Sequence, residues 1–485
     1  MRVPIAEFAP DQPALDSGVT GYVNNVVPLS QSYGPIKTVG AVGNALGTRC
    51  QGADSFRSPG GVVANFAGDS TKLYKWDGTA WNDVSRLAGG AYTIASTDFW
   101  DFEQFSGVVV AANGTDALQA WTLDSSANFA ALAGSPPVAR FVSTIRDFLV
   151  VARVSSAENR VQWPDISSTT AWASGQADSQ DLPIGGRIMG LAGGNEGLVL
   201  SESALHRMIY VGTPAIFEFQ PISRILGCAA EGSVAQNGDR TYFWAYEGFF
   251  AVDGAQVVTP IGGDKVKDYV ANNINPEYLS RVISAVDPIT RNYWFAFPSR
   301  ESASGTVDTQ IIYSPTTNRF SRASLAFDYI FSARTNLGYT IDTIDSLYGN
   351  LDAITVSLDA PELSGSPKQT FAVFGTDKKM GFFSGTNMAA TVDTVEAQIY
   401  EDSRSFVDAA RVLVDGGTPS VAIGTRNNQT DSVTWSTAVA QNDVGECPFN
   451  VDEARYHRGR ITTVSGDTWS HIQGIDVRAF PTGNR

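Results

Sequence analysis

The sequence predicts a mainly β protein: an irregular β-propeller, a C-terminal β-sandwich-like platform domain and an extended N-terminal arm. Three observations predict it. Short apolar runs, each bounded by Gly, Asn, Asp or Ser, recur along the chain, as is typical of antiparallel strands. Charged residues make up only 17% of the chain, fewer than long solvated helices need. The hydrophobic fraction of 43% is sufficient for a sizeable core.

We divide the chain into an arm at 1–55, a propeller-like β domain at 56–390 and a platform at 391–485. Prolines throughout the arm are expected to stop any helix and any central strand. The arm also carries large apolar side chains, which indicates that it lies on the platform or on a neighbouring subunit. The candidate interface residues of the arm are Phe8, Pro10, Leu15, Tyr22 and Tyr33.

The propeller prediction depends on the spacing of the apolar runs. The centres of the first six are Val63, Val109, Val150, Val199, Phe243 and Trp294. Successive spacings run from 41 residues (Val109 to Val150) to 51 residues (Phe243 to Trp294). A seventh run, at 370–374, follows after a longer step that contains an inserted segment at 340–348. Hairpins repeated every 40–50 residues are typical of propeller blades, and six or seven fit. A pair of β-sandwich domains with evenly spaced strands is the alternative.

Partner strands follow the apolar runs, for example at 72–78, 248–254 and 310–314. The dipeptides Asp77-Gly78 and Asp253-Gly254 predict tight hairpin turns, because Gly accepts a positive φ.

One helix is predicted, at 264–275, from the apolar face formed by Val266, Tyr269, Val270 and Ile274. Asp264 is its expected cap, and Pro276 follows its end.

The last hundred residues predict a separate small β unit. Some of its runs alternate between apolar and polar residues, which indicates strands with one buried face. We expect part of the arm to complete this unit. The predicted strands lie at 391–400, 410–414, 420–424, 433–435, 458–464 and 472–479.

Charge and cysteine content exclude several classes of protein. The net charge is −16, and tight nucleic-acid binding needs clustered Lys and Arg, which we do not find. Cys50, Cys228 and Cys447 are odd in number and lack a CxxC, so they predict buried free thiols in a reducing cytoplasm. No apolar run approaches the ~18 residues of a membrane span. Pro4 and Glu7 interrupt the region where a secretory signal would lie, so none is expected.

The sequence predicts no enzyme, no cofactor and no metal. His206, His457 and His471 show no metal-ligand spacing, and no nucleophile or phosphate-loop motif is present. Residues 76–81 (WDGTAW) are loosely similar to the structural turn of sialidase propellers. A hairpin turn is the simpler interpretation of this segment, but a carbohydrate-active propeller, hydrolytic or glycan-binding, stays open as an alternative.

Both ends of the chain resemble one family. Residues 8–15 (FAPDQPAL), 23–28 (VNNVVP) and 33–35 (YGP) are similar to the opening of the tail tube nozzle (hub) proteins of short-tailed double-stranded DNA bacteriophages, also described as packaged-DNA-stabilisation proteins. Residues 454–460 (ARYHRGR) and 466–477 (GDTWSHIQGIDV) resemble their end. The layout of the middle, with its irregular blades, is also similar.

The resemblance implies a structural virion protein of the tail, assembled in the host cytoplasm. Members of the family form a homo-hexameric ring that retains the packaged genome and conducts it during ejection. The implied partners are the tail adaptor, fibres or spikes, and double-stranded DNA passing through the channel without sequence-specific binding. An adaptor or fibre-attachment protein is the alternative within the virion, and it would differ in oligomeric number.

A loop at 299–308 joins two apolar runs and is longer than a hairpin requires. Either it is an ordinary exposed loop or it narrows the channel as a gate. The candidate gate residues are Arg300, Glu301, Gly305 and Asp308.

Overall fold

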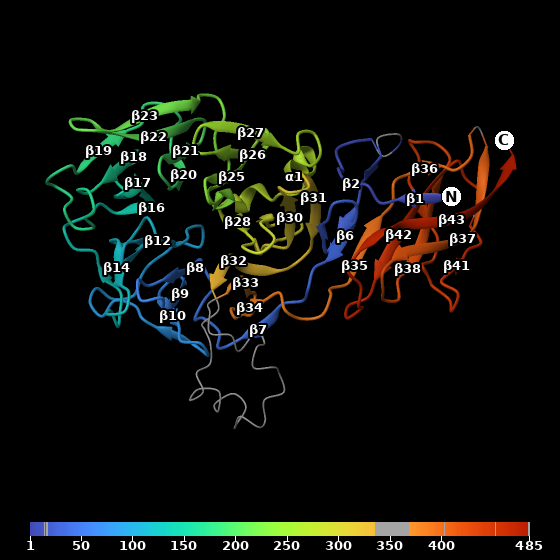
Figure 1. Cartoon of the computed structure of the whole chain (residues 1–485), viewed down its shortest axis with the longest axis horizontal. Coiled ribbons are helices and arrows are strands. Elements are labelled where there is room, and N and C mark those ends of the chain that lie inside the picture. Colours follow the sequence, from blue (N-terminus) through green and yellow to red (C-terminus); the bar gives the residue numbers. More distant parts are fainter. Residues whose placement is uncertain (14, 16–17, 335–367, 402, 452, 484–485) are drawn as a thin grey trace, which may run out of the picture.

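The structure is a computed structural model, and it describes all residues except 14, 16–17, 335–367, 402, 452 and 484–485 (Figure 1). Strands account for 49% of the described residues and helices for 4%. This confirms the mainly β prediction, since a helix content above about a fifth would have contradicted it. The segment predicted as an insertion, 340–348, lies outside the described residues.

Seven four-stranded antiparallel sheets follow one another along the described chain. The first four are β8 (Gly52–Arg57), β9 (Val63–Gly68), β10 (Leu73–Trp76) and β11 (Trp81–Asp83); β12 (Asp101–Phe105), β13 (Val108–Ala112), β14 (Gln119–Thr122) and β15 (Ala130–Ala131); β16 (Ala139–Ile145), β17 (Phe148–Val154), β18 (Ala157–Trp163) and β19 (Asp178–Asp181); and β20 (Ile188–Ala192), β21 (Gly197–Ser201), β22 (Leu205–Gly212) and β23 (Ile216–Ser223). The last three are β24 (Ala235–Asn237), β25 (Arg240–Ala245), β26 (Gly248–Asp253) and β27 (Val257–Ile261); β28 (Ile283–Val286), β29 (Tyr293–Phe297), β30 (Thr309–Ser314) and β31 (Arg319–Ala323); and β32 (Phe327–Arg334), β33 (Gln369–Gly375), β34 (Met380–Phe382) and β7 (Gly40–Val42).

The seven sheets form a propeller-like ring (Figure 1). The first strands of most successive sheets contact one another around it, the fourth and fifth sheets share a hydrophobic cluster that includes Met189 and Phe243, and β32 of the last sheet contacts β8 of the first. At this junction the backbone N–H of Arg334 donates to Ser55 Oγ at 3.0 Å. The last sheet takes its outer strand, β7, from the N-terminal part of the chain. A strand from near the start of the chain therefore completes the sheet at which the ring closes.

The apolar runs that set the predicted spacing are the second strands of the seven sheets: β9, β13, β17, β21, β25, β29 and β33. A second strand has a partner on each side, and packed sheets cover both its faces. It therefore reads as a continuous apolar run, and β9, β21 and β29 are buried at every position. The predicted strands are confirmed at these places.

The predicted helix is present as α1 (Lys267–Asn273), but its predicted cap is wrong. The residue before it is Val266, and no side chain of that residue caps the helix. Instead, the Asp11 carboxylate accepts the backbone N–H groups of Asp268 and Tyr269 at 2.7 and 2.8 Å. A residue of the arm therefore performs the capping role, because the arm crosses the first turn of α1. Two 3₁₀ helices, η1 (Glu231–Ser233) and η2 (Pro276–Arg281), contact each other, and η1 also contacts β25 and β28 of the ring.

Two further sheets, which we call the platform, lie beside the ring (Figure 1). The first sheet contains β37 (Arg404–Val414), β41 (Cys447–Pro448), β43 (Ile472–Gly483), β6 (Tyr33–Pro35), β5 (Val26–Pro28) and β1 (Arg2–Pro4). The second contains β39 (Thr434–Trp435), β38 (Ser420–Arg426), β42 (Tyr456–Thr463), β35 (Ala390–Asp393), β4 (Val23–Asn24), β36 (Ala397–Gln398) and β40 (Val439–Ala440). The arm also forms a parallel pair, β2 (Glu7–Phe8) and β3 (Val19–Thr20).

The arm thus supplies strands to the sheets built by the last hundred residues: β1 and β6 pair with β43, and β4 pairs with β35. The prolines of the arm were expected to prevent any central strand. Strand β6 differs from this expectation, because it contains Pro35 and yet lies between β43 and β5. Its neighbour β43 pairs with it only at Tyr33, so the missing N–H of Pro35 interrupts no bond to that strand.

One hydrophobic core joins the arm, the platform and the fifth and sixth sheets of the ring. Tyr33 lies fully buried in it; its hydroxyl accepts the N–H of Phe8 at 2.8 Å and donates to the carbonyl of Phe320 at 3.3 Å. The guanidinium of Arg319 in β31 donates to the carbonyls of Ala6 and Leu29, at 2.9 and 2.8 Å. These bonds satisfy arm backbone groups that the short strands leave unpaired. The platform and the ring are therefore fastened together through the arm.

Candidate functional site

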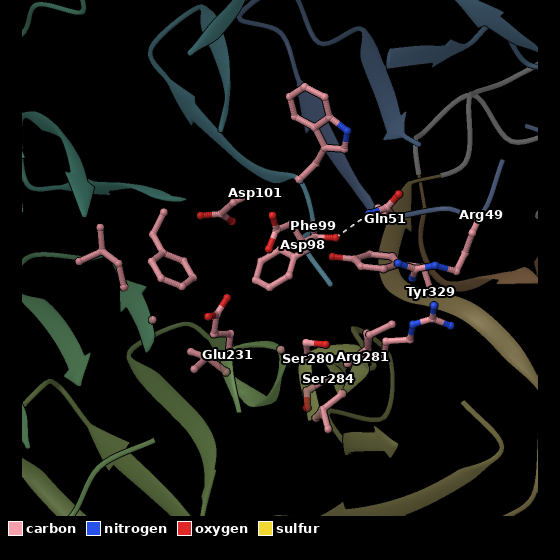
Figure 2. Close-up of a pocket in the computed structure, with 18 residues that line it drawn as sticks. Arg49, Gln51, Asp98, Phe99, Asp101, Glu231, Ser280, Arg281, Ser284 and Tyr329 are labelled. Atoms are coloured by element: carbon pink, nitrogen blue, oxygen red, sulfur yellow. Dashed lines mark hydrogen bonds between the residues drawn. The ribbon is translucent and has the colours of Figure 1, made fainter. Parts of the chain in front are cut away.

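A cavity of about 140 Å³ lies at the centre of the ring, and all seven sheets contribute to its wall (Figure 2). Each sheet contributes through its first strand or the residue just before it. One lining residue from each sheet, in chain order, is Gln51, Asp101, Phe141, Leu191, Val234, Ile283 and Tyr329. Because its wall is assembled from residues nearly 280 positions apart, this axial cavity exists only once the ring has closed.

Charges of opposite sign occupy different sides of the axial cavity. Arg49 and Arg281 lie on one side with Tyr329, while Asp101 and Glu231 lie on the other (Figure 2). Arg49 and Arg281 donate to backbone carbonyls, among them Ser96 O at 2.9 Å and Ser304 O at 3.0 Å, and neither forms an ion pair in the described part of the chain. Burial lowers the pKa of Arg49, and the nearby charge of Arg281 lowers it further. A cavity of this size and polarity can hold a small polar molecule.

Three carboxyl groups on the first two inner strands have strongly raised pKa values. Burial raises the pKa of Asp54 and of Asp101 to about 7, and that of Glu103 to about 8. The negative charge of Asp101 adds to the rise at both Asp54 and Glu103. Hydrogen bonds to these carboxylates lower their pKa values and so oppose the rise. One example is the bond that Asp101 accepts from the N–H of Val142 at 2.8 Å. Near neutral pH these acids are therefore partly protonated.

These pKa values predict that the folded chain loses stability as the pH rises from 6.5 to 8. A carboxyl group with a raised folded-state pKa binds its proton more tightly when folded, so its contribution is present at low pH and is lost as the pH passes 7 to 8. His206 and His457, whose pKa values burial lowers, are mostly neutral in both states above pH 6.5. We expect the Tm to fall by about 3 °C over this interval.

Thermal unfolding followed by circular dichroism at several pH values tests this dependence. The double substitution Asp54→Asn and Glu103→Gln should flatten it, whereas Glu247→Gln, at an exposed position, should leave it unchanged. A Tm that is constant or rises from pH 6.5 to 8 would contradict the prediction.

A buried ion network braces the wall of the axial cavity. Glu231 in η1 pairs with Arg140 of β16 through Oε2 at 3.1 Å, and with Arg153 of β17 through Oε1. The Arg140 side chain is only 4% exposed, and its guanidinium lies 3.5 Å from the centroid of the Phe99 ring. Burial lowers the pKa of Arg140, and the charge of Glu231 opposes that effect. This network links the second, third and fifth sheets at the cavity wall.

A second and larger cavity, of about 560 Å³, adjoins the first and shares Asp98, Glu231 and Ser280 with it. Arg153 and Arg187 contribute to its wall. Among the described residues, no group of three or more His, Cys, Asp or Glu could hold a metal ion. The two cavities together form a polar, mixed-charge recess at the ring axis.

The residues that the sequence singled out lie in different places. Phe8 and Tyr33 are buried together in the shared core, Pro10 and Leu15 are half-buried, and Tyr22 is 37% exposed. The three histidines are separate, with His206 in β22, His457 in β42 and His471 just before β43. Cys50, Cys228 and Cys447 are free and buried. Asp77 closes the turn of the 76–81 segment by accepting the N–H groups of Thr79 and Ala80, both at 2.8 Å.

The loop at 299–308 lies against α1 and η2. The N–H of Arg300 donates to Asn273 O at 2.8 Å, and Asp308 accepts both the N–H and the hydroxyl of Ser299, at 2.8 and 2.7 Å. Gly305 is buried against Tyr278, and an added Cβ there would lie 2.4 Å from that ring. Arg300 and Glu301, near the start of the loop, are exposed. Because Arg281 lines the axial cavity and also donates to Ser304 O, the middle of the loop borders the recess.

The axial recess and the ion pairs of Glu231 with Arg140 and Arg153 in its wall were not predicted from the sequence. Arg140 does carry a signal, since a lone charged residue inside the apolar stretch 138–142 (VARFV) indicates a buried, paired guanidinium. The partner, Glu231, carries none, because it lies in a short polar stretch 91 residues away.

Comparison with known proteins identifies no family. No family model matches the chain, and no curated protein matches it. Among solved structures, it is similar to the extracellular domain of a putative one component system, BT4673, from B. thetaiotaomicron, with 12% identity and a TM-score of 0.41 over 84% of this chain. The chain spans 48% of that protein. BBS1N in complex with ARL6DN matches with 9% identity and a TM-score of 0.40, over 72% of this chain and 96% of that one. YCF48 bound to a D1 peptide matches with 8% identity and a TM-score of 0.38, over 74% of this chain and 97% of that one.

In the part of the chain that the structure describes, no helix has the length and apolar character of a membrane span.

Proposed function

We propose that the ring is an irregular seven-bladed β-propeller, that the platform is a β-sandwich, and that the chain is a structural subunit of a phage tail nozzle. In this role six copies surround a channel that retains packaged DNA and conducts it during ejection. The protein acts by assembly, in the virion, and catalyses no reaction.

One observation carries the proposal. Four of the segments that resemble the nozzle family come from opposite ends of the chain, yet they lie together in the platform; in the remaining segment, 8–15, Asp11 instead contacts α1. Residues 23–28 and 33–35 form β4, β5 and β6, while 454–460 and 466–477 contribute to β42 and β43. Strands β6 and β43 pair directly, and β4 and β42 both pair with β35. The resemblance of these four segments thus falls on one structural unit, as expected when short motifs reflect a common architecture.

The axial cavity limits where DNA could pass. At about 140 Å³ it has the volume of a small molecule, and aromatic and charged side chains narrow it. A double helix, whose major groove alone is ~12 Å wide, does not fit through it. The proposed channel therefore lies between copies, with the platform and the propeller of each copy forming part of its wall. The net charge of −16 per chain supports a channel with little attraction for phosphate.

We expect the purified chain to form closed rings with six-fold symmetry. Negative-stain electron microscopy gives the symmetry, and analytical ultracentrifugation gives the mass in solution. Six-fold rings support a nozzle, whereas twelve-fold rings indicate an adaptor and trimers a fibre-attachment protein. A chain that stays monomeric at all accessible concentrations contradicts the proposal.

A carbohydrate-active propeller is the second candidate, and the axial recess favours it, because seven strands converge there on a polar cavity. Thermal-shift measurements with a panel of oligosaccharides separate the two. A saturable rise in Tm that Arg49→Ala and Arg281→Ala abolish would favour glycan binding at the axis.

A further inference from the structure

The outer face of the second platform sheet carries an alternating column of guanidinium groups and aromatic rings. Arg460 lies 4.0 Å from the centroid of Trp435 and 5.1 Å from that of Tyr22. The guanidinium of Arg458 lies 5.5 Å from the centroid of the Trp435 ring. The guanidinium of Arg322 in β31 lies 5.8 Å from the centroid of the Tyr22 ring. We call these five residues the arginine–aromatic ridge. It runs from the platform onto the sixth sheet of the propeller.

The alternation of side chains along β42 places the arginines of the ridge on one face of the sheet. In β42, His457, Gly459 and Ile461 are buried, while Arg458 and Arg460 lie on the opposite, half-buried face. Trp435 of β39 pairs with Gly424, and its ring covers that glycine so closely that an added Cβ would lie 2.9 Å from it. The glycine therefore lets the indole lie against the sheet between two guanidinium groups. This gives a pre-organised surface, which loses little side-chain entropy when it is covered.

The ridge is positively charged on a strongly negative chain. Arg426 of β38 lies on the same face as the three ridge arginines, and within the described residues two carboxylates pair with this group: Asp393 with Arg460 at 2.7 Å, and Glu396 with Arg426. The Arg458 side chain forms no hydrogen bond or ion pair within the described chain, and its Nε is buried without a hydrogen-bond partner. Burial lowers the pKa of Arg458; the charges of Glu396 and Asp393 oppose this effect, whereas Arg426 and Arg460 add to it. A half-buried guanidinium without a partner is costly, and an external acceptor would relieve that cost.

We propose that the arginine–aromatic ridge is a docking surface for an acidic surface on a second copy of this chain. Two features favour a protein partner. Trp, Tyr and Arg are the residues that dominate the energetics of protein interfaces. A chain with 50 acidic and 34 basic residues also offers complementary surface on every neighbouring copy. The inference rests on the proposed ring assembly and assigns one of its interfaces.

The first test is a charge-neutral substitution, Arg458→Gln, measured by sedimentation over a range of concentrations. Because the Arg458 side chain forms no hydrogen bond or ion pair within the described chain, the Tm of the monomer should change little. The concentration at half-assembly should rise at least about tenfold, and the salt dependence of assembly should decrease. The matched control is Arg478→Gln, an exposed arginine of β43 on the other platform sheet. Equal assembly of wild type and Arg458→Gln overturns the assignment.

The second test identifies the occupant. A photo-cross-linking residue is placed at Trp435, and labelled and unlabelled copies of the full chain are mixed with and without a short DNA duplex. Cross-links between labelled and unlabelled copies, at Asp- or Glu-rich peptides, support the proposal. Cross-links to DNA alone, or only within one copy, overturn it. If rings form and Arg458→Gln leaves their assembly unchanged, the nozzle function stands and the ridge assignment is wrong. If the chain does not assemble at any concentration, both the nozzle function and the ridge assignment are wrong.

Discussion

Deletion of residues 1–35 is expected to unfold the platform and to abolish assembly. The deletion removes β1, β4, β5 and β6, and with them six buried apolar side chains of the shared core: Val3, Ile5, Phe8, Val23, Val26 and Tyr33. Burying one such side chain contributes roughly 1.5–3 kcal/mol, so their combined loss is on the order of 10 kcal/mol. This is comparable with the whole stability of a typical domain.

Limited proteolysis and near-ultraviolet circular dichroism measure the outcome. The truncated chain should lose protection of 390–483 while the seven-sheet ring, which keeps β7, retains its own. A smaller matched pair refines the test: Phe8→Ala should cost about 3–5 kcal/mol, as truncation of a buried aromatic does. Leu29→Ala, at a 37% exposed position of the same arm, should cost less than about 1 kcal/mol. A protease-resistant C-terminal region in the truncated chain would contradict the role given to the arm.

Substitution of Glu231 by Ala is expected to destabilise the ring by about 3 kcal/mol. Removing one partner of a buried ion pair typically costs 3–5 kcal/mol, because the remaining charge stays buried and unpaired. Here Arg140, with a 4% exposed side chain, would lose its carboxylate. Glu231 is the partner of two arginines at once, and Arg153 would lose it as well.

Chemical denaturation gives the free energy of unfolding of this variant. The control Glu247→Ala removes an exposed carboxylate of the neighbouring sheet and should change stability by less than about 0.5 kcal/mol. The double variant Arg140→Met and Glu231→Ala should recover part of the loss, because it leaves one fewer unpaired charge. Equal stability of Glu231→Ala and wild type would show that the network contributes nothing.

The sequence predicted the strands whose environment is uniform. The second strand of each sheet lies between two partner strands and two packed faces, so its residues are apolar at nearly every position. Outer strands lack this signature: β15 and β19 are exposed throughout, and their residues resemble those of loops. Their pairing is determined by the hairpin that precedes them rather than by their own composition.

Features that depend on distant pairs could not be predicted. The capping of α1 by Asp11 joins residues more than 250 positions apart, and the local cap candidate, Asp264, lies too far before the helix. The axial recess requires seven first strands to converge, and no single segment records that convergence. The arginine–aromatic ridge could not be predicted for the same reason, because Tyr22, Arg322 and Trp435 lie in different sheets or connections that are far apart in the sequence. The assignment to a tail nozzle remains a proposal from the resemblance of the two chain ends and their meeting in the platform.

The pairing of early and late strands has a consequence for synthesis on the ribosome. Strand β7 pairs with β34, and β1 pairs with β43, so these two early strands gain their partners only after 380 or more residues have been translated. Such non-local pairing slows folding, and the unpaired edges are open to wrong partners in the meantime. A nascent chain interrupted before β34 can close neither body. Under the proposed nozzle function, only chains whose translation has passed that point can join a ring, so the fold itself excludes incomplete chains from assembly.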